Sequence, residues 1–252
     1  MCRHLAYLGT PRTLHELLYT PEHSLKVQAY APRMSRACIL NADGFGAGWY
    51  DDTRPTPVRY RRAQPMWTDV SFADVAGVVR TGCAVAAVRS ATPGFPVDES
   101  CAQPFTDQQR LFSHNGVIEG FAGVEAKLRE LAGDPAPYPD ARAPVDSALL
   151  FALAVAQWGA GASLGEGLAH VVRTVTPLAG GRYNLLAADG RTLAATAWGD
   201  TLFVRSDPVR TGSPGPHVVI ASEPYDDEPG WEEVPDRSLV TAGSGAVSIS
   251  PL

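Results

Sequence analysis

Residues 1–9 read MCRHLAYLG, which places a cysteine directly after the initiator methionine and just before a short apolar segment. Residues 5–9 are typical of a buried strand, and Gly and Pro at 9–11 predict a turn after it. The apolar segments CAVAAVRS at 83–90 and HVVIASEP at 217–224 are also typical of buried strands. We expect these three segments to lie in the interior of one layered domain.

The order of the other segments indicates the fold class. Helical patterns fill the middle of the chain and strands lie towards both ends, with a hairpin at 183–199 joined by Asp189-Gly190. Such segregation favours an α+β fold over a parallel βαβ sheet. We therefore expect a single domain over 1–252, with two antiparallel sheets between layers of helices. Helices are predicted at 13–19, 68–79, 121–131, 148–159 and 164–175.

Two of these helices carry local start signals. Thr13 with Glu16 three residues later forms a capping-box pattern for the first helix. Asp146 and Ser147 precede the apolar run ALLFALAVAQWG and are predicted to cap the fourth.

Gly44, Gly46 and Gly48 resemble a nucleotide-binding G-x-G pattern. That motif needs a helix directly after it, whereas Trp49-Tyr50-Asp51-Asp52 is typical of a strand running into a turn. We therefore expect a strand that passes close to neighbouring atoms.

Composition excludes several classes of function. The net charge of −6 and the lack of a basic tract argue against nucleic acid or an acidic membrane surface as partner. The four cysteines are far apart and form no C-x-x-C pair, which argues against a zinc site and a disulfide framework. No apolar stretch is long enough to span a membrane, and no signal peptide is apparent. We expect a cytoplasmic protein that needs no metal and no other cofactor.

Cys2 is the candidate nucleophile. If Met1 is removed, Cys2 carries both a thiol that attacks a carbonyl and a free α-amine that accepts the thiol proton. The α-amine has a reference pKa of about 7.7–8.0, which suits a base near neutral pH. The alternative is an incidental thiol that acts as a small apolar residue.

Asn115-Gly116 is the candidate oxyanion hole for such a nucleophile. Acyl transfer passes through a tetrahedral oxyanion that needs fixed donors, such as a side-chain amide and a backbone N–H. Asparagine provides the first, and glycine allows a ligand to approach the second without a Cβ in the way. The alternative is a plain tight turn with a positive φ, and a turn is predicted here between a strand and the following helix.

Arg89 and Asp146 are candidates for binding an amino-acid group. A guanidinium matches a carboxylate with two parallel hydrogen bonds, and an acid binds an ammonium. The alternatives are a surface ion pair for Arg89 and a helix N-cap for Asp146. His4 and His114 are interpreted as structural, since an N-terminal nucleophile has its own base.

Several motifs occur in the order found in a known family. Cys2, VRSATPG at 88–94, FSHNGVIEG at 112–120 and VDSALLFAL at 145–153 resemble the class II glutamine amidotransferases, which are N-terminal nucleophile hydrolases. The segment ASEPYDDEPGWEEVP at 221–235 is similar to the family's closing strand region. The resemblance covers nearly the whole chain and implies a four-layer αββα sandwich.

The resemblance also implies roles for the catalytic residues. Cys2 matches the nucleophile of the mature enzyme, which would begin at this residue after loss of Met1. Asn115 and Gly116 match the residues of the oxyanion hole.

Three more residues match substrate-binding positions. Arg89 matches the arginine that binds the substrate α-carboxylate, Thr92 matches a threonine in the same loop, and Asp146 matches the acid that receives the α-ammonium. One departure is visible, because Pro93 stands where many glutamine-using members have histidine.

The segments SLKVQAYAP and NADGFGAGWY are similar to the stand-alone subgroup of this family in ergothioneine biosynthesis. Members of that subgroup remove the γ-glutamyl group from γ-glutamyl-hercynylcysteine sulfoxide, giving glutamate and hercynylcysteine sulfoxide. The resemblance thus implies a small-molecule γ-glutamyl substrate and no obligatory synthase subunit. The sequence does not define an oligomeric state.

Two alternative functions stay open at this point. One is a glutaminase subunit that supplies ammonia to a separate synthase, and the other is a non-catalytic sensor of γ-glutamyl metabolites. Tyr7, Phe45, Trp49 and Trp231 are candidates for a cation–π contact with a trimethylated leaving group.

Overall fold

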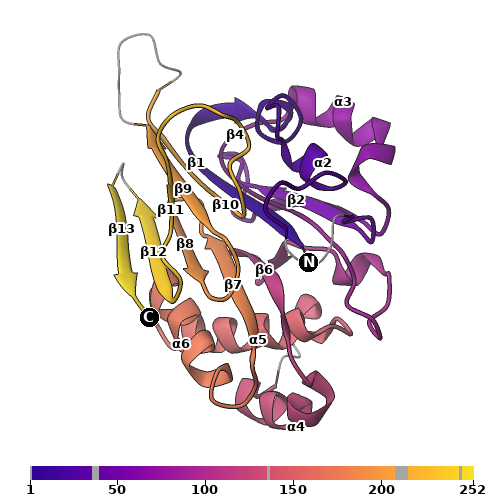
Figure 1. The fold of residues 1–252 in the computed structure, drawn as a ribbon, viewed down its shortest axis with the longest axis vertical. Helices are drawn as coiled ribbons and strands as arrows, with labels where there is room; N and C mark the ends of the chain where they lie inside the picture. The colour runs from indigo at the N-terminus through magenta and orange to yellow at the C-terminus, as the bar shows by residue number, and fades with distance from the viewer. Residues whose placement is uncertain (1, 36–39, 135–136, 208–214, 244–245) are drawn as a thin grey trace.

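The computed structural model describes residues 2–35, 40–134, 137–207, 215–243 and 246–252. Thirteen strands in this part of the chain form two antiparallel sheets, and helices cover them (Figure 1). One sheet has seven strands in the order β11-β9-β10-β1-β4-β2-β3, and the other has six in the order β13-β12-β8-β7-β6-β5. The predicted α+β class is confirmed.

The seven-stranded sheet combines the first four strands of the chain with three strands from residues 203–233. Its strands are β1 (Arg3–Thr13), β2 (Phe45–Trp49), β3 (Val58–Arg62), β4 (Arg80–Val88), β9 (Phe203–Asp207), β10 (His217–Ala221) and β11 (Trp231–Glu233). The six-stranded sheet contains β5 (Phe105–Thr106), β6 (Leu111–Ile118), β7 (Gly181–Ala188), β8 (Thr192–Ala197), β12 (Ser238–Gly243) and β13 (Ala246–Pro251).

Helices cover the two outer faces. They are α1 (Leu14–Leu18), α2 (Leu25–Gln28), α3 (Val70–Val78), α4 (Phe121–Ala132), α5 (Asp146–Gly159) and α6 (Leu164–Val175). Short 3₁₀ turns occur at Met66–Thr68, Glu99–Cys101 and Pro139–Arg142. Figure 1 shows α2 and α3 beside the strands β1, β2 and β4, and α5 and α6 at the other sheet.

Three apolar layers hold the sandwich together. Leu17 and Phe72 of the first helices pack on Tyr7 and other residues of the seven-stranded sheet. Phe151 belongs to the layer that joins α5 and α6 to the six-stranded sheet. Ile220 belongs to a third layer formed by side chains of both sheets. The order helix, sheet, sheet, helix is the predicted αββα sandwich, and successive strand residues serve alternate layers.

Local signals located several elements correctly. Thr13 and Glu16 form the predicted capping box at the start of α1. The helix predicted at 164–175 has those bounds and begins with a second capping box, formed by Ser163 and Glu166. The hairpin at Asp189-Gly190 joins β7 to β8, as predicted.

Three local predictions were wrong. The turn expected at 9–11 is a continuation of β1, and an irregularity between Leu8 and Arg12 absorbs the glycine and proline within the strand. The turn expected at Asn115-Gly116 lies inside β6, and neither residue has a positive φ. Asp146 is the first residue of α5, while Val145 occupies the N-cap position.

The glycines of β2 are explained by close packing. A Cβ on Gly46 would lie 2.4 Å from the carbonyl oxygen of Gln103, and one on Gly48 would lie 2.7 Å from a methyl group of Leu111. The expected close approach of this strand to its neighbours is therefore confirmed.

Among the described residues, no helix is both long and apolar enough to cross a membrane.

Candidate active site

Cys2 lies at one end of the sandwich, directly before β1. The pairing of Arg3 with Val88 places the end of β4, and therefore Arg89, beside it. The pairing of Leu5 with Ala221 brings the end of β10 to the same edge. Cys2 is partly exposed, and its Sγ lies 4.0 Å from the carbonyl oxygen of Ser90. Met1 lies outside the described residues.

Asn115 reaches this edge from the other sheet. Its side chain is fully buried, and Nδ2 lies 3.4 Å from Oγ of Ser222 and 3.3 Å from a carboxylate oxygen of Asp200. The same Ser222 hydroxyl accepts a hydrogen bond of 3.0 Å from the backbone N–H of His4. The Asn115 amide therefore lies next to the backbone that carries Cys2. The neighbouring carboxylate fixes the orientation of the amide, because a carboxylate must face a donor.

Position 116 has no room for a side chain, because the backbone of β7 lies too close to it. A Cβ at this position would lie 1.9 Å from the carbonyl oxygen of Arg182 and 2.4 Å from Nε2 of His114. Glycine is therefore explained here by packing between two strands. The predicted tight turn failed because pairing over the length of β6 and β7 outweighs the local turn preference of Asn-Gly.

Arg89 does not form the surface ion pair that was one interpretation of it. It is only 5 % exposed, and Nη1 donates to the carbonyl oxygens of Pro96 at 3.0 Å and Asp43 at 3.3 Å. Within the described residues Nη2 has no hydrogen-bond partner. The guanidinium is thus fixed by two carbonyls, which leaves the Nη2 amino group for a ligand. In the same loop, the carbonyl of Thr92 accepts a hydrogen bond of 3.0 Å from Phe95.

Asp146 links α5 to the strand that carries Asn115. One carboxylate oxygen accepts a hydrogen bond of 3.0 Å from the N–H of Ile118, and the other accepts one of 2.8 Å from Ser147. The side chain is 4 % exposed. The oxygen bound to Ser147 also accepts from the Ser147 hydroxyl at 3.3 Å, whereas the oxygen bound to Ile118 retains a lone pair that can accept from an ammonium.

His4 and His114 have the surroundings of neutral, structural histidines. Burial lowers the pKa of His4 to about 3, and the nearby His114 and Arg3 act in the same direction. Burial also lowers the pKa of His114, although the Asp146 carboxylate opposes this effect. His114 bridges the Ser147 hydroxyl at 2.9 Å and the Arg182 carbonyl at 2.9 Å. Neither ring is poised to carry a proton to Cys2.

Sequence reasoning missed a second group of buried polar residues at this site. Arg3 and Asp200 form an ion pair of 3.7 Å with almost no exposed surface, and Ser222 and Asn184 are fully buried. The available signal in the sequence was Arg3, a charged residue at the start of an apolar strand. Asp200 lies in an unremarkable Trp-Gly-Asp-Thr loop, so no sequence pattern indicated it.

The aromatic candidates for a leaving-group contact are mostly unsuitable. Tyr7, Phe45 and Trp49 are buried in the layer between the seven-stranded sheet and its helices. Trp231 is half-buried, and its indole N–H donates to Asp226 at 2.8 Å. The sequence pattern could not separate core aromatics from ligand-facing ones.

One surface cluster has the residue types of a metal site. Ligand atoms of Glu22, His23 and Asp227 lie within 4.8 Å of one another. Arg33 forms an ion pair of 2.8 Å with Asp227, and that carboxylate is two-thirds exposed. The arginine already neutralises the carboxylate that would bind a cation, so the cluster fits a surface ion-pair network better.

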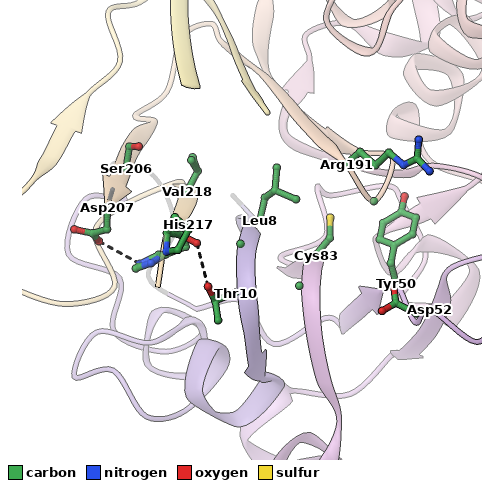
Figure 2. A pocket seen from close by; sticks show the side chains of 14 residues that line it. Leu8, Thr10, Tyr50, Asp52, Cys83, Arg191, Ser206, Asp207, His217 and Val218 are labelled. Carbon is green, nitrogen blue, oxygen red and sulfur yellow. Dashed lines mark hydrogen bonds and ion pairs between the residues drawn. The ribbon is translucent and has the colours of Figure 1, made fainter. Parts of the chain in front are cut away.

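A cavity of about 830 Å³ lies at the other end of the sandwich (Figure 2). Its lining includes Leu8 and Cys83, which are paired across β1 and β4, together with His217. Leu8 is six residues along β1 from Cys2, which is about 20 Å in an extended strand. Burial raises the pKa of the Cys83 thiol to about 12, so this cysteine is not a competing nucleophile.

Comparison with known proteins gives a consistent result. The chain is 44% identical over 254 aligned residues to the "Gamma-glutamyl-hercynylcysteine sulfoxide hydrolase" of Mycolicibacterium smegmatis, with full coverage of both chains. It is 42% identical to the protein of the same name from Mycobacterium tuberculosis, covering all of this chain and 97% of the relative. No family model matched the chain.

Solved structures support the fold. A glutamine aminotransferase class-II domain protein from Silicibacter pomeroyi superposes with a TM-score of 0.69 over 99% of both chains, at 22% identity. A glutamine phosphoribosylpyrophosphate amidotransferase from B. subtilis superposes with a TM-score of 0.68 at 15% identity. The match covers 99% of this chain and 49% of that one. Identities of 44% and 42% over the full length, together with the shared fold, lead to one conclusion: the chain belongs to the γ-glutamyl-hercynylcysteine sulfoxide hydrolase family, whose fold is that of the class II glutamine amidotransferases.

Proposed function

We propose that this protein hydrolyses γ-glutamyl-hercynylcysteine sulfoxide to glutamate and hercynylcysteine sulfoxide, with Cys2 as an N-terminal nucleophile. The observation that carries the proposal is the position of the Asn115 amide. It comes from the second sheet and contacts Ser222, which binds the backbone of His4, two residues after Cys2. This position supports the assignment of the Asn115 amide as a donor to the oxyanion, for which it would exchange its hydrogen bond to Ser222.

Substrate binding is assigned to the γ-glutamyl group. The free Nη2 of Arg89 donates to the α-carboxylate, and Thr92 lies in the loop that follows. Asp146 accepts from the α-ammonium through the carboxylate oxygen that has only the Ile118 N–H as partner. Because Arg89 is held by two carbonyls, it is positioned before the substrate arrives, which reduces the entropy lost on binding.

Acylation begins when the α-amine of Cys2, freed by loss of Met1, accepts the thiol proton. The sulfur adds to the γ-carbonyl, and the oxyanion is stabilised by Asn115 Nδ2 and the N–H of Gly116. The intermediate collapses, the C–N bond breaks, and the α-ammonium of Cys2 returns its proton to the leaving amine. Water then adds to the glutamyl thioester, and glutamate leaves as the thiol is restored.

Replacement of Cys2 tests this scheme. Cys2→Ala removes the sulfur, so glutamate release from the sulfoxide substrate should fall by at least about 10⁴-fold while the circular dichroism spectrum is unchanged. Cys83→Ala is the matched control, because it removes a buried thiol at the opposite end of the sandwich and should retain turnover. Normal turnover by Cys2→Ala would overturn the proposal.

Glutamine is the comparison substrate in the same assay. A free-standing hydrolase should release glutamate from the sulfoxide without any second protein, and residues 2–252 should act as one catalytic unit. We also propose that it works in the cytoplasm. Hydrolysis of glutamine alone, stimulated by an added synthase, would instead favour a glutaminase subunit.

A further inference from the structure

Arg3, the residue after the nucleophile, is a buried cation with few partners. Its side chain is 0 % exposed, and its nearest carboxylate oxygen, on Asp200, is 3.7 Å from Nη2. Among the described residues, none of Nε, Nη1 and Nη2 makes a hydrogen bond. A guanidinium has five N–H donors, and leaving them unpaired in the interior destabilises the fold, so a function for the charge would explain why the arginine is retained.

Asp200 is held firmly in place beside this cation. Asn184 Nδ2 donates to the backbone oxygens of Asp200 and Thr201 at 3.1 and 3.0 Å, and its Oδ1 accepts from Trp198. One carboxylate oxygen of Asp200 accepts from the N–H of Thr201 at 2.9 Å. The other oxygen faces both Arg3 and Asn115. The loop therefore presents one carboxylate oxygen to the two groups in a fixed geometry.

That oxygen has opposite effects on the proposed reaction. It orients the Asn115 amide, because it accepts from Nδ2 and so directs this donor group. It also places a negative charge 3.3 Å from the amide nitrogen that is proposed to bind the oxyanion. In a buried site such repulsion is weakly screened. The Arg3 guanidinium offsets the charge of Asp200 without occupying the amide.

We propose that Arg3 and Asp200 are positioning residues of the oxyanion hole: Asp200 orients Asn115, and Arg3 is the buried counter-ion that prevents Asp200 from repelling the oxyanion. This inference rests on the proposed roles of Cys2 and Asn115. It differs from a purely structural ion pair in the quantity that should change when one partner is removed. A structural pair stabilises the fold, so loss of either partner would lower stability and leave kcat per folded molecule unchanged.

The test uses four variants and glutamate release from γ-glutamyl-hercynylcysteine sulfoxide. Arg3→Met keeps the length of the side chain but leaves Asp200 uncompensated, so kcat should fall by about 100-fold with KM changed by less than about threefold. Arg3→Lys restores the charge and should recover kcat to within about tenfold of wild type. Asp200→Asn keeps an oxygen that accepts from Asn115 and should lower kcat by less than about tenfold.

The double variant Arg3→Met/Asp200→Asn gives the decisive comparison. If Arg3 compensates Asp200, removing the carboxylate charge should restore at least about tenfold of the kcat lost in Arg3→Met. Additive losses, or losses in KM alone, would overturn the inference. If Arg3→Met does not fold, the same comparison is made between Arg3→Gln and Arg3→Gln/Asp200→Asn, which also leave position 3 neutral, and additive losses of kcat would overturn the inference.

Two controls separate this result from the underlying proposal. Asp226→Asn makes the same change in an ion pair with Arg205, near Arg12 and away from Cys2, and should leave kcat unchanged. Intact mass must show loss of Met1 in every variant, since residue 3 lies close to the processing site. A wild-type protein that releases no glutamate contradicts the proposed function, whereas active wild type with unaffected Arg3 variants contradicts only the roles of Arg3 and Asp200.

Discussion

At the scale of single residues, the site shows how functional side chains are oriented by oxygen atoms from distant parts of the chain. Arg89 uses Nη1 on two carbonyls and keeps Nη2 without a partner among the described residues. Asn115 directs Nδ2 towards the edge where Cys2 lies, between Ser222 and Asp200. In both cases the orientation comes from backbone or carboxylate oxygens that no short motif reveals.

Arg89→Lys should weaken substrate binding more than catalysis. A lysine has one compact charge and cannot donate to two carbonyls and a carboxylate in the same plane. We expect KM for the γ-glutamyl substrate to rise by about 10- to 100-fold with a smaller change in kcat. Arg80→Lys makes the same change at an exposed position and should leave both constants unaltered. An unchanged KM in Arg89→Lys would remove Arg89 from the binding site.

At the scale of elements, β6 is the clearest case of tertiary pairing that decides a local structure. Asn115-Gly116 has the composition of a hairpin turn, yet both residues pair with β7. Helices were easier to locate, since capping boxes at Thr13 and Ser163 are local signals. The N-cap predicted for Asp146 failed because its carboxylate binds the N–H of Ile118, a partner that is distant in the chain.

Gly116→Ala tests the close contact between β6 and β7. The new Cβ would overlap the carbonyl oxygen of Arg182, so the strands must separate, and we expect the free energy of unfolding to fall by about 3 kcal/mol. Gly123→Ala is the control, because a Cβ there meets nothing within 4 Å and lies in helix α4. That change should stabilise the protein by up to about 1 kcal/mol. Urea unfolding measures both, and equal effects would contradict the packing argument.

At the scale of the whole molecule, strands that are distant in the sequence, β1, β4 and β10, meet at the edge that holds Cys2. Apolar alternation and segregation of helices from strands were enough to predict two sheets with helices outside. The ion pair between Arg3 and Asp200 could not be predicted, because their proximity depends on the stacking of the two sheets. The cavity beside Cys83 likewise appears only when both sheets are in place.

Stability should decrease in mild acid. The pKa of His4 in the folded protein is about 3, below the ordinary value of 6.5, so the unfolded chain binds more protons between these values. The free energy of unfolding therefore falls as pH drops below 6.5, with a slope approaching about 1.4 kcal/mol per pH unit from this residue alone. Burial lowers the pKa of His114 and of His217 as well, which adds to the slope.

His4→Gln isolates the contribution of His4. Urea unfolding at pH 7, 6 and 5 should give a shallower loss of stability in His4→Gln than in wild type. His15→Gln, at an exposed site, should keep the wild-type slope. Parallel slopes for His4→Gln and wild type would show that His4 does not remain neutral in the folded protein.

The central claim is that Cys2, as the first residue of the working enzyme, forms a covalent glutamyl intermediate. Acid quenching of the enzyme during turnover of γ-glutamyl-hercynylcysteine sulfoxide, followed by mass spectrometry of the N-terminal peptide, tests it directly. The account predicts a peptide that begins at Cys2, carries one glutamyl group in a thioester, and is unmodified in the absence of substrate. An active enzyme that retains Met1, or a glutamyl group on any other residue, would contradict it.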